Sequence, residues 1–209
     1  MPQFLLEVLS EEIPARMQPR AAADLEKQAR ERLTADGLDW AALKAYVTPR
    51  RLALVVDGLP AATPDVTEER RGPRADAPEK AVDGFLRGTG LAREDLETRE
   101  TEKGTFFFAT IHKPGRNTID VLADAVPAIL DGIPWPKSMR WGTHRRRWVR
   151  PIHRLVAVFN GAVVPTRYDP VEAGDHTAGH PFHAPAPFRV TDFDTYRDGL
   201  QARYVMLDP

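Results

Sequence analysis

The chain has 209 residues, enough for one sizeable hydrophobic core or two small ones. Its 29 basic and 30 acidic side chains nearly balance, and 42% hydrophobic content is ordinary for a soluble globular protein. The absence of cysteine excludes disulfides and thiolate metal sites. Residues 1–7 lack a signal-peptide pattern and no apolar run reaches about 18 residues, so the sequence predicts a cytoplasmic protein without a membrane span.

The first 60 residues predict a small segment of strands and helices. Apolar runs and apolar periodicity predict a strand at 4–9, a helix at 19–33, a short helix or turn at 40–46 and a strand within 48–58. Ser10, followed by two acids, has the chemistry of a helix N-cap. Arg50 and Arg51 lie at the start of the last of these strands. They are either a solvated pair or a contact for RNA or another subunit.

The middle of the chain predicts a loop, two helices and a hairpin. Residues 61–77 are rich in Pro, Asp, Glu and Arg and have no helical or strand period, which predicts a long surface loop. The patterns beyond it predict a helix at 78–91, a hairpin of strands 96–101 and 105–112 that turns at 102–104, and a helix at 117–130. Phe106–Phe108 are expected to pack in a core, and Pro127 is expected to kink or restart the second helix.

The last third of the chain predicts a hairpin and a terminal helix. Asn160 and Gly161 suit the positive φ angles of a type I′ turn, and β-branched runs flank them at 152–158 and 162–168. Residues 192–207 predict a helix that runs into a strand. The sequence contains no internal repeat.

These elements predict an α+β fold of mixed or antiparallel sheets, with β-hairpins and a few interspersed helices, in one unit or two sub-domains. The predicted division is an N-terminal segment at 1–60, the loop at 61–77 and a second α+β segment at 78–209. The second segment either stands alone or packs with the first as one unit.

Positive charge is concentrated in residues 134–154, which contain seven Lys and Arg residues, no acid and three of the four tryptophans. Such a mixture suits phosphate contacts together with stacking on bases. The alternative is that the tryptophans anchor a loop on the core while the arginines pair with acids elsewhere. The candidate residues for binding RNA or a partner are Lys137, Arg140, Trp141, Arg145, Arg146, Arg147, Trp148, Arg150 and His153, with Arg50 and Arg51 from the earlier strand.

The sequence shows no pattern of a complete active site. It lacks a Gly-x-Ser-x-Gly elbow and a phosphate-binding glycine loop, so no catalytic residue is predicted. His176, His180 and His183 have a spacing that would suit a metal on a helix, but Gly179 and Pro181 disfavour a helix there, and no metal site is predicted. A hydrolase-like pocket around these histidines and His153 is a remaining alternative.

Residues 134–142 and 149–153 resemble the signature region of the β subunit of the bacterial heterotetrameric glycyl-tRNA synthetase. The resemblance continues along the chain at Glu7, 10–14, 48–53, 72–73, 84–85, 103–104 and 177–182. Within the last segment the chain departs from the family pattern, because Ala178 and Pro181 stand where the family has arginine. A role in RNA contact is therefore not carried over to these two positions.

The resemblance implies an N-terminal fragment of a β subunit that acts in protein biosynthesis as part of an aminoacyl-tRNA synthetase. In this family the α subunit activates glycine with ATP and Mg²⁺, and the β subunit supplies tRNA recognition and helps to build the assembly. The implied partners are glycine tRNA, the α subunit and the remainder of the β subunit. No cofactor is expected in the fragment, which by itself should be inactive. A purely structural docking module is the main alternative.

Overall fold

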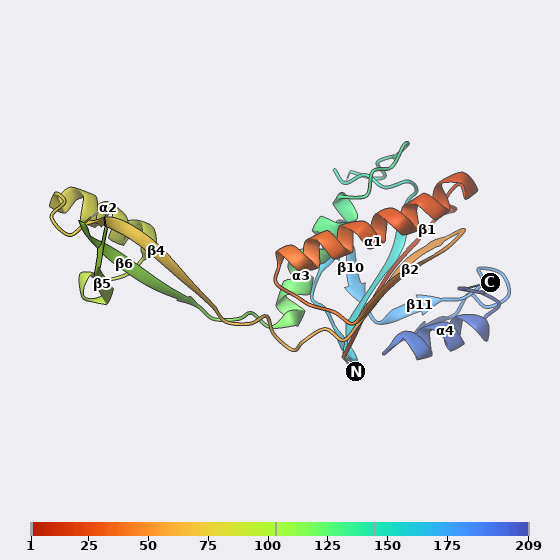
Figure 1. Ribbon diagram of the computed structural model, residues 1–209. Coiled ribbons are helices and arrows are strands. Elements are labelled where there is room, and N and C mark those ends of the chain that lie inside the picture. Colours follow the sequence, from red (N-terminus) through yellow and green to blue (C-terminus); the bar gives the residue numbers. More distant parts are fainter. Residues whose placement is uncertain (1, 103, 144, 209) are drawn as a thin grey trace. The chain divides into compact units, whose positions relative to one another are not determined.

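The structure is a computed structural model that describes residues 2–102, 104–143 and 145–208 (Figure 1). The chain divides into two compact units, one formed by 1–63 with 116–209 and the other by 64–115. The first unit is therefore built from both ends of the chain, whereas the sequence division placed its boundaries at 60, 77 and 78. The α+β class predicted from the sequence is confirmed.

The first unit is organised on a mixed sheet. Its strands lie in the order β2-β3-β1-β7-β10-β9, with β8 paired to β7. The strands are β1 (Gln3–Ser10), β2 (Ala42–Thr48), β3 (Arg51–Asp57), β7 (Ile152–Phe159), β8 (Ala162–Val163), β9 (Arg167–Tyr168) and β10 (Val171–Gly174). Only the β10 to β7 pairing is parallel among these described strands. The central strands are mostly apolar because both faces of the sheet are covered, and Glu7 in β1 and Arg51 in β3 are the buried charged exceptions among the described residues of these two strands.

Side chains alternate between two separate cores on the two faces of this sheet. Leu6 and Leu54 face α1 (Gln18–Ala35) and α3 (Thr118–Asp131), whereas Leu5 and Val55 face α4 (Phe193–Gln201). The second layer also contains the hairpin of β11 (His176–Ala178) and β12 (Pro187–Arg189). The period of two along a strand thus sets which residues hold each layer.

Most of the predicted elements of this unit are confirmed. The strand at 4–9 is β1, and the helices at 19–33 and 117–130 are α1 and α3. Asn160 and Gly161 have φ angles of 48° and 81° and turn β7 into β8, as predicted. The second strand of that hairpin is shorter than the predicted 162–168, since β8 contains only Ala162 and Val163.

Three local predictions are wrong. Residues 40–46 were expected to form a helix or turn, but 42–48 form β2, because pairing with β3 buries Leu43. Ser10 ends β1 and donates from Oγ to the Glu11 carbonyl, and α1 begins without a side-chain cap after the 3₁₀ turn η1 (Ala15–Met17). The described residues after α4 form no strand, since Val205 N closes back on Leu200 O at 3.0 Å.

Pro127 lies inside α3, which continues as one helix through it. A proline has no N–H, so the carbonyl four residues earlier, that of Ala123, loses its helical hydrogen bond. Thr166 Oγ1 donates to this carbonyl at 2.7 Å. The replacement bond satisfies the carbonyl, and it ties α3 to the segment that leads into β9.

The second unit is an antiparallel sheet in the order β4-β6-β5 with one helix. Its elements are β4 (Val66–Arg74), α2 (Glu79–Thr89), the 3₁₀ turn η2 (Arg93–Asp95), β5 (Leu96–Thr101) and β6 (Gly104–Lys113). The predicted helix at 78–91 and the predicted hairpin strands are confirmed, and Lys103 in the predicted turn lies outside the described residues. The loop expected at 61–77 is wrong in part, because β4 lies within it.

The sequence does not reveal β4 because the strand lies at an exposed edge of the sheet and its residues are mostly polar. Gly72 lies under α2, where a Cβ atom would approach Phe85 to 2.6 Å. The predicted core role of the phenylalanines is confirmed for Phe107, which is 9% exposed. Phe106 and Phe108 instead lie beneath arginine guanidinium groups. Among the described residues, no helix has the length and apolarity that a membrane span requires.

Candidate functional site

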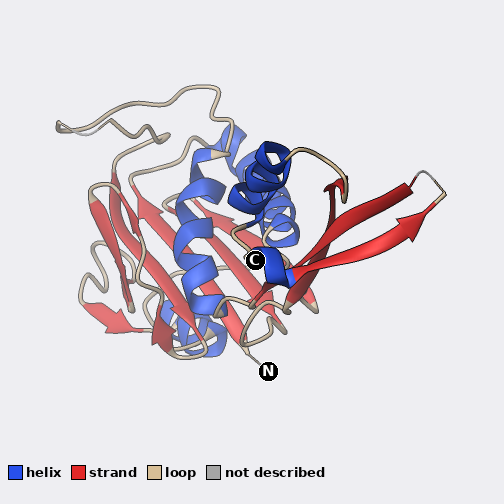
Figure 2. Cartoon of the chain, turned by 90° about the vertical axis from the view of Figure 1, so that its left-hand side faces the viewer, coloured by secondary structure: helices blue, strands red, loops and turns tan. Residues whose placement is uncertain are grey.

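The basic run leaves the sheet as a long loop between α3 and β7. We define the basic loop as residues 134–151; it is the tan loop at the upper left of Figure 2. Met139 and Trp148 close it with a pair of backbone hydrogen bonds of 2.8 and 3.2 Å. Pro134 and Pro136 favour extended backbone at its start, which carries the chain away from α3.

Tryptophans anchor the root of the basic loop. Trp148 is fully buried and packs edge-to-face with Trp135 at 5.0 Å and with Tyr168 at 5.7 Å. Trp141 is partly buried against the same core. Trp148 cannot act as a stacking platform for a base in this structure, so we leave it out of the contact surface. The root of the loop is therefore held by aromatic packing.

Four cations of the basic loop are exposed and have no carboxylate partner among the described residues. They are Lys137, Arg140, Arg145 and Arg147. Arg147 donates from Nε to Ser138 Oγ at 3.0 Å and from Nη2 to the Ser138 carbonyl at 2.8 Å. These partners are neutral, so they orient the guanidinium without cancelling its charge. Arg150 likewise donates to a neutral acceptor, the Val149 carbonyl, at 2.8 Å.

Arg146 differs from its neighbours because it is neutralised within the fold. It forms an ion pair with Asp131 at the end of α3 and lies over the ring of Tyr168, 4.6 Å from the centroid. Burial is the largest single effect and would lower the pKa of Arg146, but the hydrogen bond to Asp131, the charge of Asp131 and the interaction with Tyr168 together raise it. Burial also raises the pKa of Tyr168, whose hydroxyl donates to Asp131 at 2.9 Å. Arg146 is therefore partly a structural residue.

Arg50 and His153 meet at a second cluster, centred on Glu11. His153 Nε2 lies 2.6 Å from Glu11 Oε1, and Arg50 Nη2 lies 3.4 Å from Oε2. The hydrogen bond with His153 and the charge of Arg50 lower the pKa of Glu11. Glu11 N also donates to Pro151 O at 3.0 Å, so this cluster lies where the basic loop joins β7.

Arg51 is buried and cannot reach a partner. It is 3% exposed, and its Nε donates to Glu7 Oε2 at 3.1 Å. Glu7 also accepts hydrogen bonds from Thr177 in β11 and from the Tyr196 hydroxyl in α4. We therefore leave Arg51 out of the contact surface. The hint in the sequence was that Glu7 lies inside an apolar run and requires a cationic partner.

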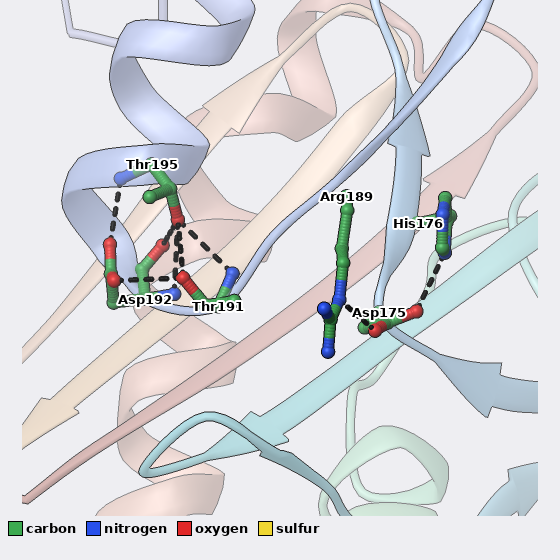
Figure 3. Close-up of polar contacts among 6 residues, drawn as sticks. All are labelled: Asp175, His176, Arg189, Thr191, Asp192 and Thr195. Carbon is green, nitrogen blue, oxygen red and sulfur yellow. Dashed lines mark hydrogen bonds and ion pairs between the residues drawn. The ribbon is translucent and has the colours of Figure 1, made fainter.

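The three histidines near the end of the chain do not converge. His176 Nδ1 lies 2.6 Å from Asp175 Oδ1, and Arg189 binds the other oxygen of Asp175 (Figure 3). The ion pair with Arg189, and then that with His176, lowers the pKa of Asp175. His180 and His183 instead stack on one another at 4.5 Å. Across residues 2–102, 104–143 and 145–208, no group of three or more His, Asp or Glu side chains is placed to hold a metal.

Sequence reasoning identified the cations but missed the residues that position them. Asp131, Ser138 and Tyr168 orient Arg146 and Arg147, and Glu11 joins Arg50 to His153. Most of these partners lie on other elements of the fold. No local pattern in the sequence distinguishes them from other surface residues.

Known proteins are similar to this chain along almost its whole length. The model of the family described as "Glycyl-tRNA synthetase beta subunit" matches residues 4–209. Proteins named glycine–tRNA ligase beta subunit are similar: that of Dinoroseobacter shibae is 51% identical over 212 residues and that of Phenylobacterium zucineum 55% over 209, each covering 100% of this chain. The chain spans only 29% and 31% of the lengths of these two relatives.

Proposed function

Because the chain belongs to the glycyl-tRNA synthetase β-subunit family, we propose that it contributes tRNA binding to the formation of glycyl-tRNA. The contact surface is the exposed side of the basic loop. The observation that carries the proposal is that Lys137, Arg140, Arg145 and Arg147 are exposed and face no carboxylate among the described residues. Four cations gathered on one loop repel each other unless an anionic partner compensates them.

Phosphate oxygens are suitable partners for this surface. Guanidinium groups bind phosphate through parallel hydrogen bonds, and each phosphate that is neutralised releases counterions. Arg150 extends the basic surface toward β7, where Arg50 and His153 share the Glu11 carboxylate. In this proposal the chain positions tRNA, while the synthetase α subunit in the cytoplasm activates glycine with ATP and Mg²⁺.

Charge reversal tests the proposal. Arg140, Arg145 and Arg147 are changed together to Glu, and binding of glycine tRNA is measured by fluorescence anisotropy over a range of salt concentrations. If about four phosphates are engaged, the logarithm of the association constant falls with log salt at a slope of roughly −3 to −4. The triple variant should lose most of this slope and most of the affinity.

A matched control carries the same change of charge elsewhere. Lys27, Arg87 and Arg197 are exposed and lie outside the basic loop. Their joint replacement by Glu should weaken binding much less than the change in the loop. Equal losses in the two triple variants, or a flat salt response of the unmodified chain, would contradict the proposal.

Docking on the α subunit is the second candidate function. It is favoured by Met139, which is 40% exposed on the basic loop, and by a cavity of about 320 Å³ lined by Trp135 and by Met17 of η1. An apolar side chain exposed on a loop is suited to a protein partner. Met139→Ser should then weaken co-purification with the α subunit while leaving tRNA binding by the isolated chain unchanged.

A further inference from the structure

A cavity of about 630 Å³ lies at the root of the basic loop, beside the C-terminal end of α3. Its volume falls within the range of roughly 300–1,000 Å³ that is usual for small-molecule sites. Arg145, Arg146 and Arg147 form part of its wall, and Trp135 and Tyr168 line it as well. The cavity therefore combines cations with aromatic and apolar surface.

The charges of the cavity favour an anion. Asp131 is the only acid among the described residues that line it, and this carboxylate is already engaged by Arg146 and by the Tyr168 hydroxyl. Arg145 has no ion pair among the described residues, and Arg147 bonds only to neutral Ser138. Two uncompensated guanidinium charges therefore remain at the cavity.

Part of the wall is held in place before any ligand arrives. Ser138 fixes Arg147 by two hydrogen bonds, and Asp131 with the Tyr168 ring fixes Arg146. A side chain that is already immobilised loses less entropy on binding. Guanidinium groups oriented in this way suit the paired oxygens of a phosphate.

The apolar side of the cavity suits a planar ring. Leu130, Ile133 and Trp135 line it, and the edge-to-face packing of Trp135 on Trp148 sets the orientation of the Trp135 indole. Aromatic and apolar surface beside arginines is the usual environment of an unstacked base with its phosphate.

We propose that this cavity binds one nucleotide unit of RNA, with its phosphate on Arg145 and Arg147 and its base against the partly exposed indole of Trp135. This assignment rests on the proposed tRNA-binding function and names the unit that is bound. A free mononucleotide has the same chemistry, so the experiments below separate the two sources.

The first experiment observes the tryptophan indole N–H signals by NMR. The chain contains 4 Trp residues, so the indole region is sparse, and Trp135→Phe identifies the signal of Trp135. The titrants are adenosine 5′-monophosphate, inorganic phosphate and a short single-stranded RNA. The Trp135 signal should shift with the nucleotide and the RNA and much less with phosphate, while the Trp40 signal stays in place because Trp40 does not line the cavity. An unmoved Trp135 signal with both nucleotide and RNA would overturn the assignment.

Variants of the arginines supply the second test. Arg145 is exposed and forms no ion pair or hydrogen bond with the described residues, so Arg145→Gln should preserve the fold. The variant should weaken nucleotide binding about tenfold through the loss of a charge-assisted hydrogen bond. Arg154→Gln is the control, since Arg154 belongs to the same basic sequence run but does not line the cavity. Equal effects of the two variants would overturn the proposed nucleotide site, because the nucleotide would then be held only by the general positive charge of the region.

Binding of intact glycine tRNA separates this inference from the proposed function. If tRNA binds with the expected salt slope while Trp135 does not respond, the nucleotide pocket is wrong and the tRNA-binding function stands. If adenosine monophosphate moves the Trp135 signal but tRNA does not bind, the proposed function is wrong and the assignment of the cavity to RNA falls with it.

Discussion

Glu7 and Arg51 form a buried ion pair between β1 and β3, with 3.1 Å between Arg51 Nε and Glu7 Oε2. Both side chains lie on the face of the sheet that α4 covers, where their nearest neighbours along the strands are Leu5 and Ala53. The carbonyl groups of Ala178, the last residue of β11, and of Gly179 accept further hydrogen bonds from the guanidinium. The pair therefore fixes the second layer of the first unit on its sheet.

Removing one partner of this pair should destabilise the chain strongly. Glu7→Leu leaves the Arg51 charge buried without a counter-charge, which typically costs about 3–5 kcal/mol. Urea denaturation should report that loss in the free energy of unfolding. The control Glu26→Gln affects a partly exposed pair with Arg30 and should cost less than about 1 kcal/mol. A loss of less than about 1 kcal/mol for Glu7→Leu would show that the pair does not hold the layer.

The Tyr196 hydroxyl donates a further hydrogen bond to the Glu7 carboxylate, at 2.5 Å from Oε2. Tyr196→Phe keeps the ring in the core but removes this donor, so the free energy of unfolding should fall by about 1–3 kcal/mol. Tyr204→Phe removes a hydroxyl from a side chain on an exposed residue and should change stability very little. Equal stabilities of the two variants would contradict a structural role for the buried hydroxyl.

Asp192 caps α4, because its Oδ1 accepts from Thr195 N at 2.7 Å (Figure 3). This backbone hydrogen bond lowers the pKa of Asp192 below the usual range of an aspartate side chain. A carboxylate with a lowered pKa stabilises the fold at pH values above that of the unfolded group, and the contribution is lost as the pH falls through the folded pKa. Asp192→Ala should therefore cost about 1 kcal/mol at pH 7.

The same variant at low pH completes this test. The difference in unfolding free energy between Asp192→Ala and the unmodified chain should shrink as the pH falls below 3.8. Asp192→Asn retains a cap without the charge and should show a smaller pH dependence. A difference that is constant from pH 7 into the acid range would mean that the cap does not depend on the charge.

Thr166 and Pro127 should be energetically coupled through the Ala123 carbonyl. Thr166→Val leaves that carbonyl without a donor, which should cost about 1–3 kcal/mol. Pro127→Ala restores a backbone N–H four residues after Ala123, so Thr166→Val should cost less in that background. A double-mutant cycle measures the coupling, and strict additivity would contradict it.

Short-range sequence patterns correctly predicted the helices and the turn whose conformation depends mainly on neighbouring residues. The 3.6-residue period gave α1, α2 and α3, and the Asn160-Gly161 dipeptide gave the turn after β7. The strands β2 and β4 were missed because pairing with β3 and β6 stabilises them, although their own residues are polar or poorly periodic. The discontinuous first unit was missed because no local pattern reports that residues 1–63 pack with 116–209.

The candidate site shows the same distinction. Composition located the basic loop and its exposed cations, but it gave no means of separating surface from core residues within the motifs. Arg51 pairs with Glu7, 44 positions earlier, and Trp148 packs between Trp135 and Tyr168. Burial of these two candidates depends on partners from distant strands and loops, so it required the fold.

Crosslinking tests the central claim most directly. Glycine tRNA containing photoreactive nucleotides is crosslinked to the heteromeric synthetase that contains this chain, and the adducts are mapped by mass spectrometry. Adducts should form within the basic loop, at residues 137–147, and should disappear when Arg140, Arg145 and Arg147 are changed together to Glu. Efficient crosslinking elsewhere in the synthetase, with no adduct in the loop, would contradict this claim.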